Sequence, residues 1–65
     1  MRINGNIEDI EPATLAALLA ARGIELGQRF VAVAVNGTVV PRSQWRGLTL
    51  GEGDEIEIVR PREGG

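Results

Sequence analysis

The residues at the C-terminal end of this 65-residue chain carry its most distinctive chemistry. The sequence closes with Gly64-Gly65, so the last group is an α-carboxylate, which has a pKa near ~3.5 and is ionised at neutral pH. Glycine has no Cβ, and a pair of glycines therefore stays extended in a channel too narrow for any other residue. A carboxylate on such a stalk suits insertion into the active site of another protein. The alternative is an idle terminus, since chain ends are often disordered.

The residue types that are missing limit the chemistry that the chain performs alone. It contains no Cys, His, Lys or Tyr, which removes the usual thiol and amine nucleophiles, the commonest general base and the common metal ligands other than carboxylates. Ser43 is the only serine, and it has no His or Lys to activate it. We therefore predict no catalytic residue, no metal site and no bound cofactor, and a protein that is not itself an enzyme.

Composition also restricts the partners and the location. The formal net charge is -2 and the arginines are spread along the chain, whereas nucleic-acid-binding surfaces show clustered basic residues. No apolar run approaches the ~20 residues needed to cross a membrane, and Met1 is not followed by the apolar region of a secretory signal. We expect a cytoplasmic protein that binds neither nucleic acid nor membrane.

Two Asn-Gly pairs predict two β-hairpins. Asn4-Gly5 and Asn36-Gly37 both suit a two-residue turn, because Asn and Gly tolerate positive φ. In the strand before the second turn, Ala alternates with Val or Phe, which puts the large side chains on one face; we expect that face to meet the helix. The flanking strands are predicted at 2–4, 6–10, 30–35 and 38–40.

One helix is predicted between the hairpins. Thr14 is suited to be its N-cap, and the stretch 15–22 consists almost entirely of strong helix formers. Gly23 stands where a glycine commonly ends a helix. The residues expected on one face, at spacings of three and four, are Leu15, Leu18, Leu19 and, at the exposed end, Arg22.

The second half of the chain predicts a short turn and a final strand. Pro41 ends the preceding strand, and a turn or short helix with Ser43 as its cap follows. Trp45 is expected to close one end of the core rather than to contact a partner. The last strand is predicted at 55–60, with Ile56 and Ile58 facing inward.

This order of elements predicts an α+β domain with a mixed sheet of four to five strands and one helix packed across one face. If the last strand pairs centrally beside the first, its end leaves the sheet clear of the edge. That arrangement is the β-grasp, or ubiquitin-like, fold. We expect residues 1–60 to form the β-grasp domain and residues 61–65 to form a flexible C-terminal tail ending in Gly-Gly.

Three stretches of the sequence match a known family. They are Val35 to Trp45, which reads VNGTVVPRSQW, then Gly53-Asp54, and the closing Gly64-Gly65. Together they resemble the ThiS family, the sulfur carrier proteins of thiamine biosynthesis, over essentially the whole chain. The charged run from Arg60 to Glu63 departs from the family, whose tails are often apolar or small before the glycines.

The resemblance implies a sulfur-carrying role with defined partners. An ATP-dependent adenylating (E1-like) enzyme would activate the carboxylate of Gly65, with Gly64 as part of the inserted tail. Sulfur from a cysteine desulfurase or rhodanese-like donor would then replace AMP to give a thiocarboxylate, and a thiazole synthase would take that sulfur. The composition agrees, because a chain without cysteine holds no sulfur on a side-chain thiol.

Three alternatives remain open from the sequence. The same chemistry could serve molybdopterin or cysteine synthesis. The chain could be a ubiquitin-like protein modifier, since Arg60 and Arg62 resemble the basic approach of ubiquitin to its glycines. It could also be a plain binding module with an idle tail. In a carrier the outward sheet face should contact the partner, with Phe30, Trp45 or the arginines as unranked candidates.

Overall fold

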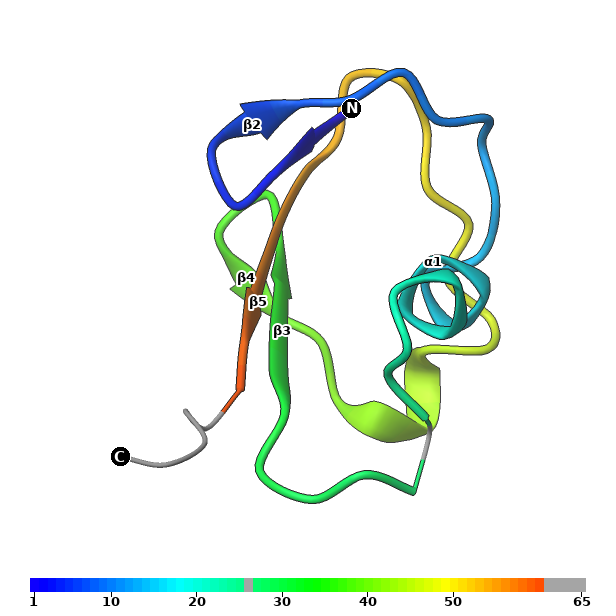
Figure 1. Cartoon of the computed structure of the whole chain (residues 1–65), viewed down its shortest axis with the longest axis vertical. Helices are drawn as coiled ribbons and strands as arrows, with labels where there is room; N and C mark the ends of the chain where they lie inside the picture. Colours follow the sequence, from blue (N-terminus) through cyan, green and yellow to red (C-terminus); the bar gives the residue numbers. More distant parts are fainter. Residues whose placement is uncertain (26, 61–65) are drawn as a thin grey trace.

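The computed structural model describes residues 1–25 and 27–60, and in that part of the chain one five-stranded sheet packs against one α-helix. Figure 1 shows the sheet nearly edge-on, with the helix on one side of it. The elements in chain order are β1 (Arg2–Ile3), β2 (Asn6–Ile7), α1 (Leu15–Ala21), β3 (Ala32–Val35), β4 (Thr38–Val39), the 3₁₀ helix η1 (Arg42–Gln44) and β5 (Glu55–Val59).

The sheet is mixed, and its order is β2-β1-β5-β3-β4. β5 lies in the centre, where it pairs in parallel with β1 and antiparallel with β3. The two outer pairs, β1 with β2 and β3 with β4, are antiparallel hairpins. This is the predicted α+β, β-grasp architecture, and the predicted central pairing of the last strand beside the first is confirmed.

Both predicted hairpin turns are present. Asn4 and Gly5 have φ of 50° and 84°, and Asn36 and Gly37 have φ of 52° and 84°. The return strand of the first hairpin is shorter than the predicted 6–10, because only Asn6–Ile7 pair with β1. Ile7 is exposed whereas Ile10 packs partly against the core, so the chain has to leave the sheet between them.

The helix follows the predicted boundaries closely. The Thr14 hydroxyl accepts a hydrogen bond from the Ala17 amide at 3.1 Å, which satisfies one of the free amides of the first turn. The helix ends at Ala21 rather than Arg22, which is the C-cap, and Gly23 follows with a φ of 80°. Its three leucines are all buried against the sheet, as predicted.

A single core fills the space between the helix and the sheet. β1 and β5 contribute Ile3 and Ile56 to it, and both side chains are buried. Trp45 is buried as well, and its indole Nε1 donates to the Val40 carbonyl at 3.0 Å, so the predicted core role is confirmed. The other buried apolar residues are Leu15, Leu18, Leu19, Ile24, Val31, Val33, Val40 and Leu50.

Four details from residue 30 onward differ from the prediction, and one is that β4 ends at Val39 rather than at residue 40. The strand expected at 30–35 begins at Ala32, because Phe30 has a φ of 62°, which is incompatible with a strand. Ser43 lies inside η1, whose N-cap position is Pro41, and no side chain caps that helix. β5 ends at Val59 instead of Arg60, with Ile56 and Ile58 inward as expected.

The predicted tail, 61–65, lies outside the described residues, so the boundary after residue 60 stays a prediction. Among the described residues, no helix combines the length and the apolar character that a membrane span requires.

Candidate functional site

The group predicted to react is not placed by the structure. Gly64 and Gly65 both lie outside the described residues, as does Arg62. The structure does define the strand that leads to them, because β5 runs to Val59 and is followed by the exposed Arg60. The candidate site is therefore built from β5 and from the surfaces around its C-terminal end.

β5 is held by side chains as well as by its two neighbouring strands. The Ile58 amide donates to Asn4 Oδ1 at 2.7 Å, and the Glu55 amide donates to Asn36 Oδ1 at 2.9 Å. Each asparagine thus forms a hairpin turn with its backbone and binds the central strand with its side chain. The Asn-Gly pairs in the sequence predict only the turns. The two side-chain hydrogen bonds to β5 are seen only in the structure.

A second network secures the start of β5. Asp54 Oδ1 accepts from Asn36 Nδ2 at 3.0 Å, and Asp54 Oδ2 accepts from the Gly51 amide at 2.7 Å. The hydrogen bond from Asn36, followed by that from Gly51, holds the pKa of the Asp54 carboxyl below its ordinary value, because both bonds favour the ionised form. Asn36 and Asp54 belong to two of the stretches that match the family in sequence, and here they are joined.

The sheet face opposite the helix carries an apolar patch next to the end of β5. Directly paired residues share a face, and the register pairs Val59 with Ala32 and Val39 with Ala34. Val59 is 64% exposed and Val39 is 70% exposed. We call these four residues the outer patch. The alternation of Ala with Val in 30–35 predicts that the two alanines share this face. That Val39 lies on the same face follows only from the strand register.

Charged residues lie beside the outer patch on the same face. Glu57 pairs in register with Ala34 and is exposed, and it therefore borders the patch. Further along the sheet, Arg2 and Glu55 are exposed and their side chains approach to 3.8 Å. An apolar centre beside charged residues is the composition expected of a protein-binding surface.

The structure separates the two aromatic candidates for partner contact. Trp45 is buried, and its indole is hydrogen-bonded to the Val40 carbonyl. The Arg42 guanidinium lies 4.7 Å from its ring centroid. Trp45 therefore belongs to the core. Phe30 is 76% exposed, and the Arg29 guanidinium lies 5.4 Å from its ring centroid. Only Phe30 of the two is therefore accessible to another protein.

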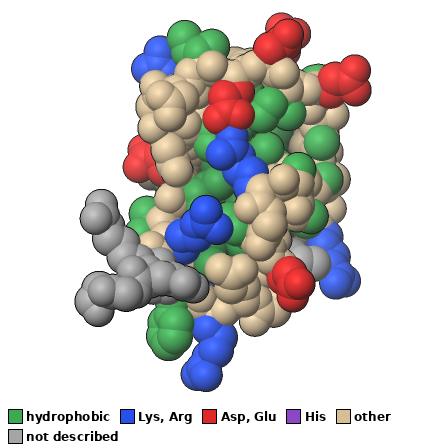
Figure 2. Space-filling view, viewed as in Figure 1, with side chains coloured by type: hydrophobic (Ala, Val, Ile, Leu, Met, Phe, Trp, Pro, Cys, Tyr) green, Lys and Arg blue, Asp and Glu red, His purple; other side chains and the backbone are tan. Residues whose placement is uncertain are grey.

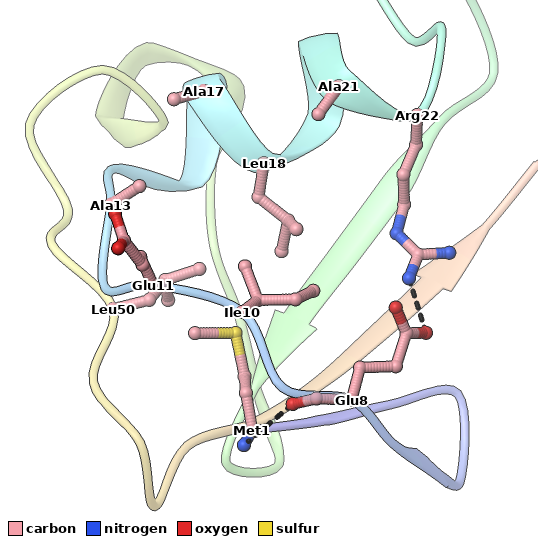
Figure 3. Close-up of a pocket in the computed structure, with 10 residues that line it drawn as sticks. All are labelled: Met1, Glu8, Ile10, Glu11, Ala13, Ala17, Leu18, Ala21, Arg22 and Leu50. Atoms are coloured by element: carbon pink, nitrogen blue, oxygen red, sulfur yellow. Dashed lines mark hydrogen bonds and ion pairs between the residues drawn. The ribbon is translucent and has the colours of Figure 1, made fainter.

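A cavity of about 320 Å³ opens on the other side of the sheet, beneath α1. Figure 2 shows hydrophobic side chains reaching the surface between the helix and the sheet, around acidic and basic side chains in contact. In Figure 3, Leu18 points from α1 toward Ile10, and Arg22 meets Glu8 at one wall. The charged groups of that wall are thus engaged with each other, and the lining is mainly apolar.

The described residues form no metal site and no group of side chains suited to catalysis. Within 1–25 and 27–60 there is no group of three or more Asp, Glu, His or Cys side chains that could hold a metal ion. Ser43 is exposed in η1, and the sequence offers no histidine or lysine to activate it. The arrangement thus exposes the end of β5 and an apolar sheet face.

Comparisons with known proteins agree with this arrangement. The ThiS family model matches residues 1–65. The crystal structure of the thiamine biosynthesis protein (ThiS) from Geobacter metallireducens superposes with a TM-score of 0.78 at 26% identity, covering 98% of this chain and 96% of that one. The solution structure of a thiamine biosynthesis protein from the same organism gives a TM-score of 0.75 at 27% identity, covering 98% and 85%. Curated proteins give no significant match.

Proposed function

Because the chain belongs to the ThiS family, we propose that it is a sulfur carrier protein of thiamine biosynthesis that holds sulfur on the carboxyl group of Gly65. The observation that carries this proposal is the family match over residues 1–65, in a sequence that closes with Gly64-Gly65. The two similar solved structures support thiamine as the pathway, because both are thiamine biosynthesis proteins.

The proposed chemistry needs a partner enzyme, because a carboxylate is a poor electrophile. An oxygen of the Gly65 carboxylate attacks the α-phosphorus of ATP, and pyrophosphate leaves to give an acyl adenylate. The terminal sulfur of a donor persulfide then attacks the acyl carbon and AMP leaves, which gives an acyl disulfide. A thiol of a partner protein attacks the donor-side sulfur of that disulfide, so that a new disulfide forms between donor and thiol and the thiocarboxylate is released. This chain has no Cys, His or Lys for these steps, so it acts as the substrate of its partners and not as an enzyme.

Three partners follow from this scheme. They are an ATP-dependent adenylating (E1-like) enzyme, a sulfur donor of the cysteine desulfurase or rhodanese-like type, and a thiazole synthase that takes the sulfur. Since activation consumes ATP, we place the carrier in the cytoplasm, where ATP is available. Gly64 accompanies Gly65 into the active site, because it has no side chain to obstruct a narrow channel.

The outer patch supports this scheme as the surface on which these enzymes dock. The outer patch lies on the face of the sheet that α1 does not cover. Val59 is two residues before residue 61, where the proposed tail begins. A partner that receives the tail must approach this end of β5. Val39 and Val59 then supply apolar area that association removes from water.

Intact mass spectrometry tests the proposal directly. The full chain is incubated with the adenylating enzyme of its source organism, ATP and a sulfur donor, and we expect a mass change equal to replacement of one oxygen by one sulfur. A variant that lacks Gly64-Gly65 should show no change, and neither should the wild type without ATP. An unchanged mass of the wild-type chain after incubation with active adenylating enzyme, ATP and the sulfur donor would contradict the proposal.

The pathway needs a second measurement, because carriers for molybdopterin or cysteine synthesis undergo the same mass change. We expect the gene to restore growth of a thiamine-requiring strain that lacks its carrier, and not to restore a molybdenum-cofactor mutant. A protein modifier would instead appear joined by amide bonds to lysine residues of other proteins.

A further inference from the structure

Phe30 combines an unfavourable backbone conformation with an exposed aromatic ring. Its φ is 62°, in the left-handed region that a residue with a bulky side chain rarely adopts. The other non-glycine residues with positive φ within the described ranges are Asn4 and Asn36, whose side chains suit that region. The ring does not gain burial in return, because Phe30 is 76% exposed. An outlier of this kind motivates a search for a function at that residue.

The neighbours of Phe30 fix its conformation. Val31 is buried in the core, and Ala32 begins β3 in register with Val59. On the other side, the Gln28 amide donates to the Glu25 carbonyl at 3.0 Å in a turn. The chain must therefore change direction at residue 30, and glycine would do so without strain. With phenylalanine at this position, an aromatic ring is instead presented to solvent.

The register places Phe30 at the end of the sheet where β5 stops. Ala32 pairs with Val59, the last residue of β5, and Phe30 lies two residues before Ala32 in the chain. Figure 1 shows the segment that leads into β3 turning at this same end of the sheet. The ring is therefore exposed at the end of the sheet where β5 stops, two residues along the chain from Ala32 of the outer patch.

The reach of the proposed tail determines which partner surface comes near this ring. Gly65 is the fifth residue after Arg60, and extended chain spans at most ~3.6 Å per residue, or about 18 Å in all. An enzyme that brings the Gly65 carboxylate to ATP must therefore cover the end of β5. We infer that Phe30 is an aromatic anchor that inserts into an apolar recess of the adenylating enzyme beside its tail channel. This inference rests on the proposed function.

Steady-state kinetics of Phe30→Gly test the inference. ATP–pyrophosphate exchange by the adenylating enzyme is measured against the concentration of full-length carrier. We expect the KM for the carrier to rise by roughly tenfold or more, as for a central aromatic contact, with kcat at saturation unchanged because the ring is remote from the reacting atoms. Thermal unfolding should show no loss of stability, since glycine suits the conformation.

Ile7→Ala is the matched control. Ile7 is 78% exposed, like Phe30, but it pairs with Arg2, which in turn pairs with Glu55 at the opposite end of β5. We expect its KM to stay within about twofold of the wild type, because Ile7 lies away from the proposed contact and residues outside the few dominant contacts contribute little. If Phe30→Gly leaves the KM unchanged, or if Ile7→Ala raises the KM as much as Phe30→Gly does, the anchor role of Phe30 is contradicted while the proposed function is unaffected. Absence of exchange with the wild-type carrier contradicts the proposed function and this inference with it.

Discussion

The two turn asparagines show how one residue serves both a turn and a distant strand. A hairpin turn of this type needs positive φ, which glycine also provides, but glycine has no side-chain acceptor. Asn4 uses that acceptor for the Ile58 amide, and Asn36 uses it for the Glu55 amide. β5 is thereby bonded near its two ends to the two hairpins that flank it.

Replacement of Asn4 measures this second role. Asn4→Gly keeps the turn and removes the acceptor, so we expect the free energy of unfolding in urea to fall by about 1 kcal/mol. The Ile58 amide should exchange its hydrogen faster. Asn4→Asp is the control, because aspartate tolerates positive φ and offers an oxygen in the same place. Equal stability of the wild type and Asn4→Gly would show that the side-chain bond contributes nothing.

The lowered pKa of the Asp54 carboxyl predicts how the stability of the fold depends on pH. Its pKa is lowered in the folded chain by the bonds from Asn36 and Gly51, so the folded state favours the ionised form. The resulting stability is present above the unfolded pKa of ~3.9 and is lost as the pH falls through the lower folded value. Asp54→Asn should weaken this dependence at acid pH.

The same variant should also be less stable at neutral pH. An amide has one acceptor oxygen, so it leaves one of the two donors without a partner, and we expect a loss of about 1 kcal/mol. Urea titrations between pH 2 and 7 measure both effects. Glu57→Gln, on the exposed face of β5, is the control for removal of one negative charge. A pH profile of Asp54→Asn identical to that of the wild type would contradict the assignment.

At the scale of elements, α1 is short and depends on its contacts. It has seven residues, fewer than an isolated helix needs for stability in water. Its N-terminal cap from Thr14 and the burial of its leucines therefore maintain it together. The Thr14 segment is also joined to the second half of the chain, because Thr14 and Thr49 form a β-bridge.

Removal of the cap tests how strongly the helix depends on it. Thr14→Ala should lower the free energy of unfolding by about 1 kcal/mol, because the Ala17 amide loses its acceptor. Thr14→Ser keeps a hydroxyl in the same place and should retain most of the stability. The measurement is chemical denaturation followed by circular dichroism. A Ser variant as unstable as the Ala variant would show that the methyl group matters and that the cap does not.

The elements also show what the sequence predicts and what it does not. The Asn-Gly turns, the capped helix and the inward face of β5 depend on local patterns, and these predictions are confirmed. The start of β3 was predicted two residues too early, because its apolar run continues through Phe30, whose conformation is imposed by its neighbours.

The candidate site was predictable only in part, for the same reason. The outward sheet face was expected to contact partners, but the exposure of Phe30 and the burial of Trp45 depend on tertiary packing. The core position of Trp45 was expected from the sequence, whereas no local pattern marks Phe30 as exposed. The side-chain bonds from Asn4 and Asn36 to β5 join residues far apart in sequence, and the strand order must be known before they can be expected.

At the scale of the whole molecule, the two sides of the sheet differ in burial. The core, the helix and η1 lie on one side, and the outer patch lies on the other. Changes to the outer patch should therefore affect association and leave folding largely intact, because Val39 and Val59 are already exposed to water.

A charge placed in the outer patch tests this division. Val39→Glu should raise the KM for the carrier in ATP–pyrophosphate exchange by roughly tenfold, because association would desolvate a carboxylate without a partner. Its unfolding temperature should stay near that of the wild type. Gln44→Glu adds the same charge at an exposed position in η1, and we expect no effect on KM. Equal KM values for both variants would place docking elsewhere.

The central position of β5 also determines how the body resists force. A pull on Arg60 along the strand loads the hydrogen bonds to β1 and β3 at the same time, so these bonds must slide and break as a group. A strand at the edge of the sheet would instead peel away one bond after another. Under the proposed function, in which partner enzymes draw in the C-terminal end, this traction would fall on a strand that has a neighbouring strand on each side.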